Sequence, residues 1–395
     1  MRRAVFPRAR VAALVLPLLP LFASNCNSAR IPAHTEEVAP GVHYHSADLI
    51  DGPWAIHALE INLPEARRAG VDLRSARAPV SGPGLEKTSE LARDAIAAIN
   101  GDFFYTGTPV RSSGLQICDG QLVEEPRPRT AFAINQAGEP MVAVFQLRAG
   151  LMTRAGHVLT ISHLARPPQR ADEITYYNPQ SQAWTDTVRA PVGYILQSLD
   201  GETMVINDTL KVRVHQVRRR KWPLKLKPGQ WLIAAGREFS RSRVVAPGDT
   251  VQLFCQLPPA TQPLRQAISG GPRIVRDGVV SIEHEREHLG TDFASDRHPR
   301  TAVGFTRNRE RVYLVTVDGR QPGHSVGMTL EELAELMTTK LPQFTKSGQP
   351  AFQAVNLDGG GSTTMVVRNT VVNRPSDQTG ERPVANALLV VRSDA

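Results

Sequence analysis

The sequence predicts a β-rich fold with few helices. Thirty glycines and thirty prolines among 395 residues imply many turns, which favours short strands over a helical bundle. Hydrophobic residues make up 41% of the chain and charged residues 21%, as in an ordinary globular protein. Short apolar runs recur between turn residues, and a single segment near the C-terminus has a clear helical pattern.

The N-terminal segment is typical of an export signal. Basic residues come first, and an apolar run over residues 11–23 follows, which is too short to cross a bilayer comfortably and is interrupted by prolines. Residues 21–26 resemble a bacterial lipoprotein signal that ends at Cys26, although Asn25 stands where that motif has Gly or Ala. We predict a signal peptide over residues 1–26 and export to the periplasm or envelope, with Cys26 as a candidate lipid anchor.

A small, polar segment over residues 27–40 is expected to be a tether, and residues 41–395 to form one folded domain. The signal segment holds four arginines and no acid, so its removal lowers the formal charge from +8 to +4. The densest basic stretch, residues 218–227, contains one Trp. Nucleic-acid binding requires a basic face interleaved with aromatic residues, so nucleic acid is not the expected partner. A surface that meets anionic envelope polymers fits this stretch better.

Two cysteines remain after the signal segment, Cys118 and Cys255. An exported protein can form disulfides, but the sequence does not place these two Cα atoms within bonding reach. We predict unpaired, buried thiols.

The first half of the domain is predicted as short strands joined by turns. In order, these elements are an alternating, half-buried strand over 54–61, a capped short helix over 88–93, a strand from 95 that breaks at Asn100-Gly101-Asp102, a hairpin over 113–125 and a strand over 129–134. Residues 140–260 contain many short alternating runs with turn residues. We expect this β-rich section to lie between the two halves of a site.

The second half of the domain contains further acidic or glycine-rich turns at strand ends. A glycine turn over 269–272 leads into a strand, and a buried-type strand over 312–317 ends at Asp318-Gly319-Arg320. The clearest helix covers 329–337, where Thr329 and Glu332 form a capping box.

The most distinctive stretch is a glycine-rich turn between two apolar runs within residues 354–367. It carries Asp358, three consecutive glycines and the hydroxyl of Ser362. Glycines allow a ligand to approach the backbone closely, and successive free N–H groups can form an anion-binding nest. The alternative is a tight hairpin whose glycines serve geometry only.

The segment His284-Glu285-Arg286-Glu287-His288 matches the zinc-protease pattern H-E-x-x-H. That pattern binds zinc only on a helix, where the two histidines lie one turn apart. Here the segment follows a strand-like run and meets Leu289-Gly290 at once, so we expect a surface turn. His284 and His288 are the only candidate metal ligands, and no metal is assigned.

Several of these segments together resemble motifs of the phosphodiester glycosidase domain family. The resemblance covers about residues 90–392, and the motifs occur in the order of the family. They are Asn100–Phe104, Ser269–Pro272, His298–Ala302, Val317–Arg320, Gly327–Leu330, Asn356–Ser362, Asn373–Ser376 and Glu381–Leu388.

The resemblance implies one α+β domain with a mixed β core whose glycine turns gather around a pocket. It also implies hydrolysis of a sugar-1-phosphodiester, since the family includes a mammalian enzyme that removes N-acetylglucosamine from a phosphodiester on mannose. Because the export signal has bacterial features, envelope or exopolysaccharide glycans are the expected substrates.

The chemistry of such a substrate assigns roles to the matching residues. Cleavage at C1 needs a carboxylate to stabilise an oxocarbenium-like state or activate water, and donors to hold the phosphate. We predict Asp358 and Asp102 as the catalytic carboxylates, with Asp318 third. Arginine suits phosphate oxygens, so the candidate clamps are Arg300, Arg320 and Arg382, with structural ion pairs as the alternative. Further substrate-binding candidates are Asn100, Gly270, Gly271, Asn356, Gly359, Gly360 and Ser362. No cofactor is assigned, and a divalent cation is compatible with this chemistry.

Two other functions remain open at this point. A non-catalytic envelope module would bind anionic glycan through the same turns, and sugar release separates it from a hydrolase. A zinc hydrolase would be centred on His284 and His288, and metal content together with a His284→Ala variant tests it.

Overall fold

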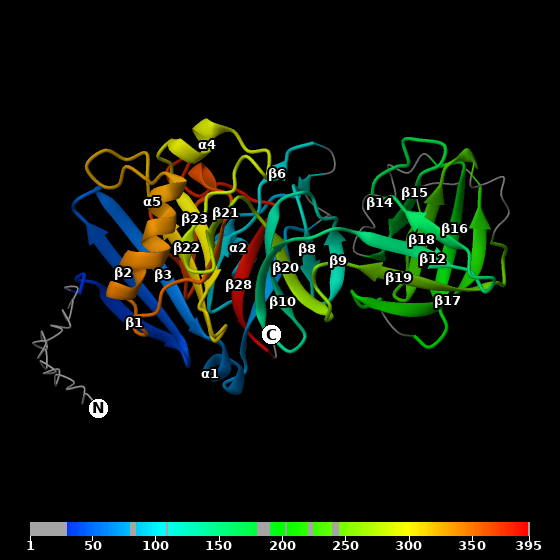
Figure 1. Cartoon of the computed structure of the whole chain (residues 1–395), viewed down its shortest axis with the longest axis horizontal. Helices are drawn as coiled ribbons and strands as arrows, with labels where there is room; N and C mark the ends of the chain where they lie inside the picture. The colour runs from blue at the N-terminus through cyan, green and yellow to red at the C-terminus, as the bar shows by residue number, and fades with distance from the viewer. Residues whose placement is uncertain are drawn as a thin grey trace, which may run out of the picture.

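The computed structural model describes residues 30–79, 84–107, 110–179, 190–201, 204–219, 224–238 and 245–393. The predicted signal peptide lies outside these residues, as does Cys26. No helix in the described ranges is long and apolar enough to cross a membrane. Strands dominate, as the composition predicted, and the described helices are short (Figure 1). These are α1 (Leu63–Arg68), α2 (Thr88–Leu91), α4 (Thr291–Ser295) and α5 (Leu330–Glu335).

The largest sheet of the main body is eight-stranded. Its strands, in spatial order, are β1 (His34–Ala39), β2 (Val42–Leu49), β3 (Trp54–Asn62), β24 (Arg311–Val317), β23 (Arg300–Phe305), β25 (Gln353–Asn356), β21 (Arg273–Arg276) and β22 (Val279–Val280). Residues 34–39 were expected to belong to a tether, and this part of the prediction is wrong. They pair with β2, and Val38 is buried, so ordered structure begins before Gly41.

Two five-stranded sheets pack against the inner face of this sheet. One contains β27 (Thr370–Val371), β26 (Met365–Val367), β5 (Ala97–Asn100), β28 (Asn386–Arg392) and β4 (Val71–Arg77). The other contains β11 (Pro140–Val144), β10 (Thr130–Asn135), β20 (Leu264–Ser269), β8 (Gln116–Cys118) and β9 (Gln121–Glu124). A continuous apolar core joins all three sheets, with Leu59, Ile99 and Phe132 among its members.

The outer face of the large sheet is covered by α5 (Figure 1). Its capping box is confirmed: Glu332 N donates to Thr329 Oγ1 at 3.1 Å, and Thr329 N donates to Glu332 Oε2 at 2.9 Å. Strand β3 therefore lies between two cores, because Ile56 packs toward α5 and Ile61 packs toward the other sheets. The alternation in its sequence predicted a half-buried strand, but both of its faces are covered.

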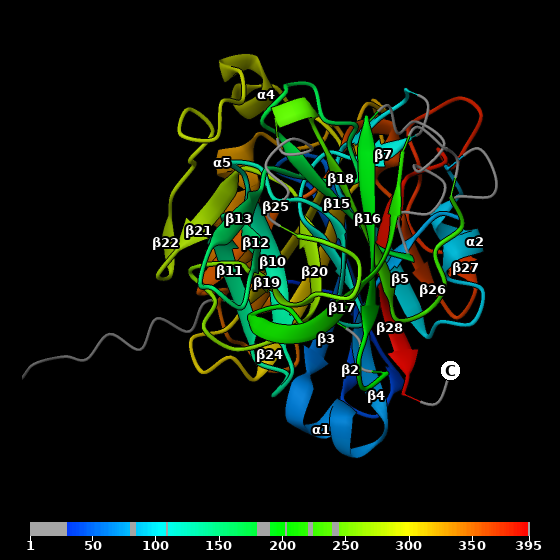
Figure 2. The ribbon, with the colours of Figure 1, turned by 90° about the vertical axis from the view of Figure 1, so that its right-hand side faces the viewer.

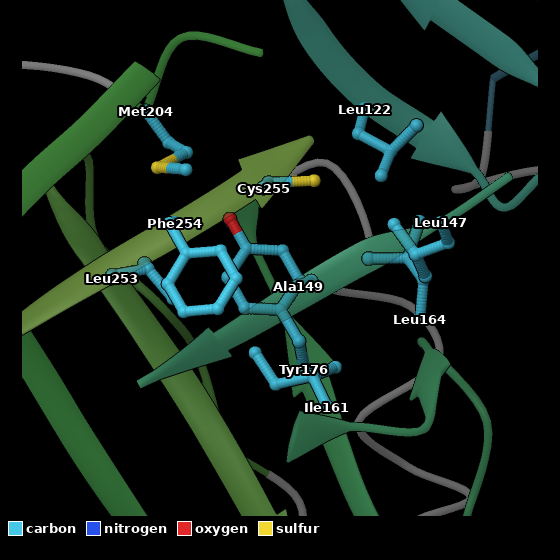
Figure 3. A pocket seen from close by; sticks show the side chains of 10 residues that line it. All are labelled: Leu122, Leu147, Ala149, Ile161, Leu164, Tyr176, Met204, Leu253, Phe254 and Cys255. Carbon is cyan, nitrogen blue, oxygen red and sulfur yellow. The ribbon is translucent and has the colours of Figure 1, made fainter. Parts of the chain in front are cut away.

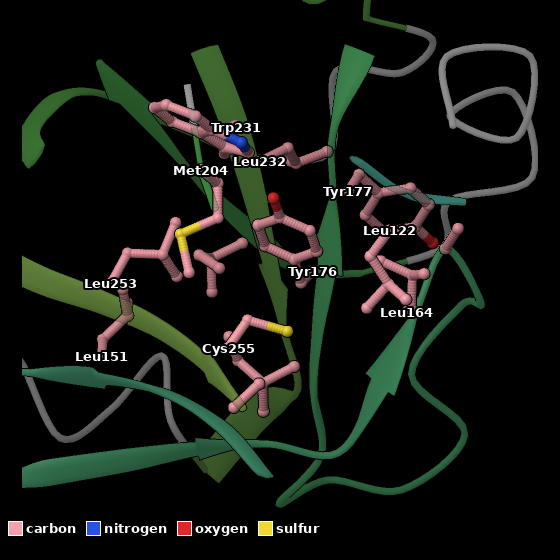
Figure 4. Close-up of a cluster of buried hydrophobic side chains, with 14 of the residues drawn as sticks. Leu122, Leu151, Leu164, Tyr176, Tyr177, Met204, Trp231, Leu232, Leu253 and Cys255 are labelled. Carbon is pink, nitrogen blue, oxygen red and sulfur yellow. The ribbon is translucent and has the colours of Figure 1, made fainter. Parts of the chain in front are cut away.

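The β-rich section forms a lobe at the opposite end of the molecule from β1 and β2 (Figures 1 and 2). Its eight-stranded sheet contains β13 (Val158–Ile161), β12 (Arg148–Met152), β19 (Thr250–Gln256), β17 (Asp208–Arg218), β16 (Val192–Ser198), β18 (Gln230–Ala235), β15 (Ile174–Tyr177) and β14 (His163–Leu164). Figure 4 shows Trp231, Tyr176 and Met204 in its apolar core. The section is β-rich as predicted, and it lies between the two groups of candidate site residues along the chain.

The expected mixed core is almost wholly antiparallel. Among the strand pairs of the described residues, only β14 and β15 run parallel. A further small ribbon joins β6 (Phe104–Tyr105) and β7 (Arg111–Ser112).

Candidate active site

Strand register brings the acidic and glycine turns to one end of the main body. In the large sheet, Arg300 at the start of β23 pairs with Val317 at the end of β24, and Ala302 pairs with Asn356 at the end of β25. In the neighbouring sheet, Asn100 at the end of β5 pairs with Ala387 near the start of β28. The segments that follow or precede these residues therefore meet at the same edge, where α4 also lies (Figure 1).

Asp102 is a deeply buried carboxylate of this cluster. Its side chain is buried, and Oδ2 accepts hydrogen bonds from Ser112 Oγ and Gly114 N, both at 2.8 Å. Its other oxygen, Oδ1, is buried without a partner among the described residues. Burial raises the pKa of Asp102 to about 7, and the charge of Asp358 acts in the same direction. Asp102 therefore holds a proton over part of the neutral range.

Asp358 lies on the adjoining turn. Its backbone N–H donates to Gly101 O at 2.9 Å, and Asn100 Nδ2 donates to its carbonyl at 2.7 Å. Burial raises the pKa of Asp358 to about 6, while Ser362, Arg382 and the Gly359 N–H act in the opposite direction. The structure thus brings together the two carboxylates that the sequence placed first. The charge of Asp358 contributes to the raised pKa of Asp102.

Two buried asparagines connect the turns through hydrogen bonds. Asn100 is buried, and its Oδ1 accepts from Thr301 Oγ1 at 2.8 Å and from Thr364 N at 3.1 Å. Asn356 is also buried and donates from Nδ2 to Gly271 O at 2.8 Å. Its Oδ1 has no partner among the described residues. Both side chains therefore hold backbone segments in place, and Asn356 keeps one oxygen available.

Glycine is required where the turns touch. A Cβ at Gly270 would clash with the carbonyl of Asn356, and one at Gly359 would clash with the carbonyl of Pro299. Gly271 has φ of 126°, a conformation that side chains disfavour. These glycines allow three backbone segments to approach closely.

The glycine turn is not an open nest of backbone donors. Four N–H groups in residues 358–363 already donate to backbone carbonyls: Asp358 to Gly101, Gly360 to Pro299, Ser362 to Gly359 and Thr363 to Gly360. The sequence suggested that successive free N–H groups here would bind an anion. Because most are satisfied internally, side chains must supply most of the donors for a phosphate.

Asp318 lies on the next turn and belongs to a different hydrogen-bond network. It is buried, and Oδ1 accepts from Asn373 Nδ2 at 2.9 Å while Arg374 N donates to Oδ2 at 2.9 Å. His324 Nε2 lies 2.9 Å from Oδ2, and His57 Nε2 lies 4.0 Å from it. Asn373 also donates to Thr363 O at 3.1 Å, which links this network to the turn of Asp358.

The three candidate arginines have different surroundings. Arg300 is buried and donates to three backbone carbonyls, those of Met328, Phe293 and Asp296. Arg382 forms a two-pronged ion pair with Asp377, with contacts of 2.8 and 3.0 Å. Arg320 is exposed and lies against Gly360. Its NH2 group is 3.2 Å from His298 Nδ1, and no carboxylate of the described residues pairs with it.

Replacing each of two arginines with lysine should separate these roles. Arg300→Lys should lower the free energy of unfolding by about 2–4 kcal/mol, because an ammonium cannot serve three carbonyls held in the fork of a guanidinium. Arg320→Lys should leave the melting temperature nearly unchanged and lower kcat/KM toward a sugar phosphodiester by about tenfold. Arg286→Lys, on an exposed turn, is the matched control. A loss of stability without loss of rate at Arg320 would contradict its role as a phosphate ligand.

The H-E-x-x-H segment forms a turn, as its flanking residues predicted. His288 has φ of 56°, which is incompatible with a helix through the two histidines. The described residues contain no group of three His, Cys, Asp or Glu side chains that could hold a metal. The Glu287 carboxylate instead connects two backbone segments, because it accepts hydrogen bonds from Thr130 N and Arg273 N, both at 2.8 Å. The zinc-binding geometry proposed for His284 and His288 is therefore absent.

Sequence reasoning did not single out several residues that shape the site. Asn386 accepts from Asp102 N through Oδ1 and donates to Ser112 Oγ, so it fixes the backbone of residue 102 and one of the two donors to its carboxyl group. His57 and His324 approach Asp318 from two sides. Asn386 lies within a quoted motif, which was a usable indication, whereas nothing local to His57 or Ser112 indicated contact with a distant acid.

Two cavities lie away from the turns, in the β-rich lobe. One, of about 10 Å³, is apolar and is lined by Tyr176, Met204 and Cys255 among others (Figure 3). The other, of about 410 Å³, is lined by Arg154, His157 and Asp249 among others. Neither includes a predicted site residue. Neither cavity is the pocket that was expected between the glycine turns.

Both described cysteines are unpaired, as predicted. Cys255 is buried, and Cys118 is half-buried next to Ser75. Burial raises the pKa of Cys118 to about 11 and that of Cys255 to about 12, so both remain thiols at neutral pH.

Comparison with known proteins decides the family. The family model described as phosphodiester glycosidase matches residues 185–391, more than half of the chain. The chain belongs to the phosphodiester glycosidase family. The match includes Asp318 and Asp358, whereas Asp102 precedes it and is placed at the site by the structure.

The chain is also similar to a curated protein and to two solved structures. An N-acetylglucosamine-1-phosphodiester alpha-N-acetylglucosaminidase from Bos taurus is 33% identical over 124 residues, covering 29% of this chain. The chain spans about a fifth of that relative's length, since 21% of it is covered. A solved Synechocystis structure has a TM-score of 0.66 at 22% identity, covering 91% of this chain and 63% of that one. A solved Burkholderia pseudomallei structure has a TM-score of 0.62 at 22% identity, covering 88% and 76%. These two structures show that the fold is shared.

Proposed function

We propose that this protein is an exported hydrolase that cleaves the glycosidic bond of sugar-1-phosphodiesters in envelope or exopolysaccharide glycans. Membership of the phosphodiester glycosidase family supports hydrolysis of this bond type. The single observation that carries the proposal is the carboxyl pair on adjoining turns, with pKa values raised to about 7 at Asp102 and about 6 at Asp358. Pairs of carboxyl groups with separated pKa values are the chemical basis of glycosidase catalysis.

The two pKa values suggest a division of labour. Asp358 has the lower value and is less enclosed, so at neutral pH it is the ionised group that faces C1 or activates water. Asp102 has the higher value and can deliver a proton to the departing phosphate oxygen. Phosphate leaves readily, so the proton contributes less to the rate than it does with an ordinary glycoside. Arg320 is positioned to neutralise charge on the phosphate.

Turnover of an activated N-acetylglucosamine-1-phosphodiester tests this proposal directly. We expect release of free sugar and a phosphomonoester. Binding across a panel of sugar phosphodiesters without any release would instead indicate a non-catalytic module for anionic glycan.

The rate should have a narrow dependence on pH. The active form needs Asp358 ionised and Asp102 protonated, so kcat/KM should fall below pH about 6 and above pH about 7. A profile that is flat between pH 5 and pH 8 would contradict the assignment of both groups.

A further inference from the structure

The turn over residues 318–325 presents two nitrogen donors, each oriented by a buried or half-buried neighbour. One is the guanidinium of Arg320, and the other is the imidazole of His324. They lie four residues apart on one turn that is closed at its base, because Ser325 Oγ donates to Asp318 O at 2.6 Å and Gln321 N donates to Ser325 O at 3.1 Å. This closure fixes where both side chains leave the backbone.

Asp318 determines which nitrogen of His324 faces outward. A buried carboxylate only accepts hydrogen bonds, so the contact of 2.9 Å requires a proton on Nε2 of His324. Asn373 and the backbone of Arg374 supply further donors to the same carboxylate, which holds it in place. Nδ1 of His324 has no partner among the described residues, and the side chain is 34% exposed. It is therefore the nitrogen that remains free for a ligand, and it donates to an anionic oxygen only when the ring is protonated on both nitrogens.

His298 orients Arg320 in a comparable way. Burial, together with the charges of Arg300 and Arg320, lowers the pKa of His298, so its ring is neutral near pH 7. The neutral Nδ1 accepts from Arg320 NH2 at 3.2 Å without adding charge. The guanidinium lies against Gly360, on the turn that carries Asp358.

We infer that the turn 318–325 is the phosphate-binding arm of the candidate site, in which the His324 ring, protonated on both nitrogens, donates from Nδ1 and the Arg320 guanidinium donates alongside it to non-bridging phosphate oxygens. Asp318 is then a positioning residue that acts through His324, and it is not one of the reacting carboxylates. This inference rests on the proposed function for the identity of the ligand. It follows from the internal use of most glycine-turn N–H groups, which leaves the phosphate to side chains.

The arm predicts a substrate preference. A phosphodiester offers two non-bridging oxygens, which matches one imidazole and one guanidinium. A neutral glycoside of the same sugar lacks both oxygens and should bind much more weakly. Inorganic phosphate carries the same oxygens and is the simplest probe.

Titration with inorganic phosphate tests the arm without requiring turnover. We would follow the side-chain nitrogen resonances of His324 by NMR and measure the dissociation constant by calorimetry at pH 7. The variants are His324→Gln, Arg320→Gln and Asp318→Asn, and His215→Gln on the exposed face of β17 is the matched control. Melting temperatures show whether each variant is folded.

We expect phosphate to shift Nδ1 of His324, and His324→Gln and Arg320→Gln each to weaken phosphate binding by about tenfold, the scale of one charge-assisted hydrogen bond. Asp318→Asn removes the carboxylate that stabilises the doubly protonated ring of His324, so it should weaken binding similarly. Unchanged phosphate affinity in folded His324→Gln, or a His324 resonance that does not respond, would overturn the inference. Phosphate binding through His324 in a protein that releases no sugar would refute the proposed function and leave the arm intact. Sugar release that is unaffected by His324→Gln would refute the phosphate-binding arm and leave the proposed function intact.

Discussion

Replacing Asp358 with asparagine should lower turnover of a sugar phosphodiester by at least about a hundredfold, the scale on which acid–base groups act. The protein should remain folded, because the backbone N–H and carbonyl of residue 358 make the contacts that hold the turn, and both survive the substitution. Asparagine is nearly isosteric but cannot carry the charge that stabilises C1. Kinetics per folded molecule, with the melting temperature as control, measure the effect.

The same variant should also move the titration of Asp102. The charge of Asp358 raises the pKa of Asp102, so its removal should lower that pKa and shift the alkaline limb of any residual activity to lower pH. An unchanged rate in Asp358→Asn would contradict the role of Asp358 at C1.

Asp102→Asn should have opposite effects on rate and on stability. We expect a loss of about tenfold to a hundredfold in turnover, at the lower end for a general acid because phosphate is a good leaving group. The amide oxygen can still accept from Ser112 and Gly114, and its NH2 replaces the carboxylate oxygen that has no described partner. The hydrogen bonds around residue 102 should therefore persist.

The stability of the wild-type protein should fall as pH rises through the range in which Asp102 ionises. Its folded pKa, about 7, lies above the ordinary value of 3.8, so the folded state binds more protons between these values and loses stability with increasing pH. Above pH 7, the full difference between the two pKa values lowers the free energy of unfolding by about 4 kcal/mol. Asp102→Asn removes this cost, so it should be more stable than wild type at pH 8 and about equal to it at pH 4. Denaturant unfolding at pH 4 and pH 8 measures the stability difference between the variant and wild type. A variant that is less stable than wild type at pH 8 would contradict a raised pKa of Asp102.

Local patterns in the sequence were sufficient for many of the elements. The capping box predicted α5, the Asp119-Gly120 turn predicted the β8–β9 hairpin, and the glycine and proline content predicted a β-rich fold. Burial of β3 on both faces was not predictable from its alternation, since it depends on where α5 packs. The position of the β-rich lobe likewise depends on the sheet pairing between strands far apart in the sequence.

The site was also partly predictable from local patterns in the sequence. Asp102 and Asp358 each lie two residues after a strand, and the family resemblance connected them, although they are 256 positions apart in the sequence. The surroundings of each arginine could not be predicted. Arg300, Arg320 and Arg382 all lie within the motifs of the family resemblance, yet one donates to backbone carbonyls, one pairs with Asp377 and one stays exposed. Only the three-dimensional arrangement distinguishes these environments.

Hydrolysis in water enriched in oxygen-18 tests the central claim most directly. A sugar-1-phosphodiester can break at the C1–O bond or at the P–O bond, and mass spectrometry of the products distinguishes them. Chemistry by Asp102 and Asp358 at C1 predicts that the label enters the released sugar and is absent from the phosphomonoester. Label in the phosphate, with none in the sugar, would show attack at phosphorus and would contradict the glycosidase assignment.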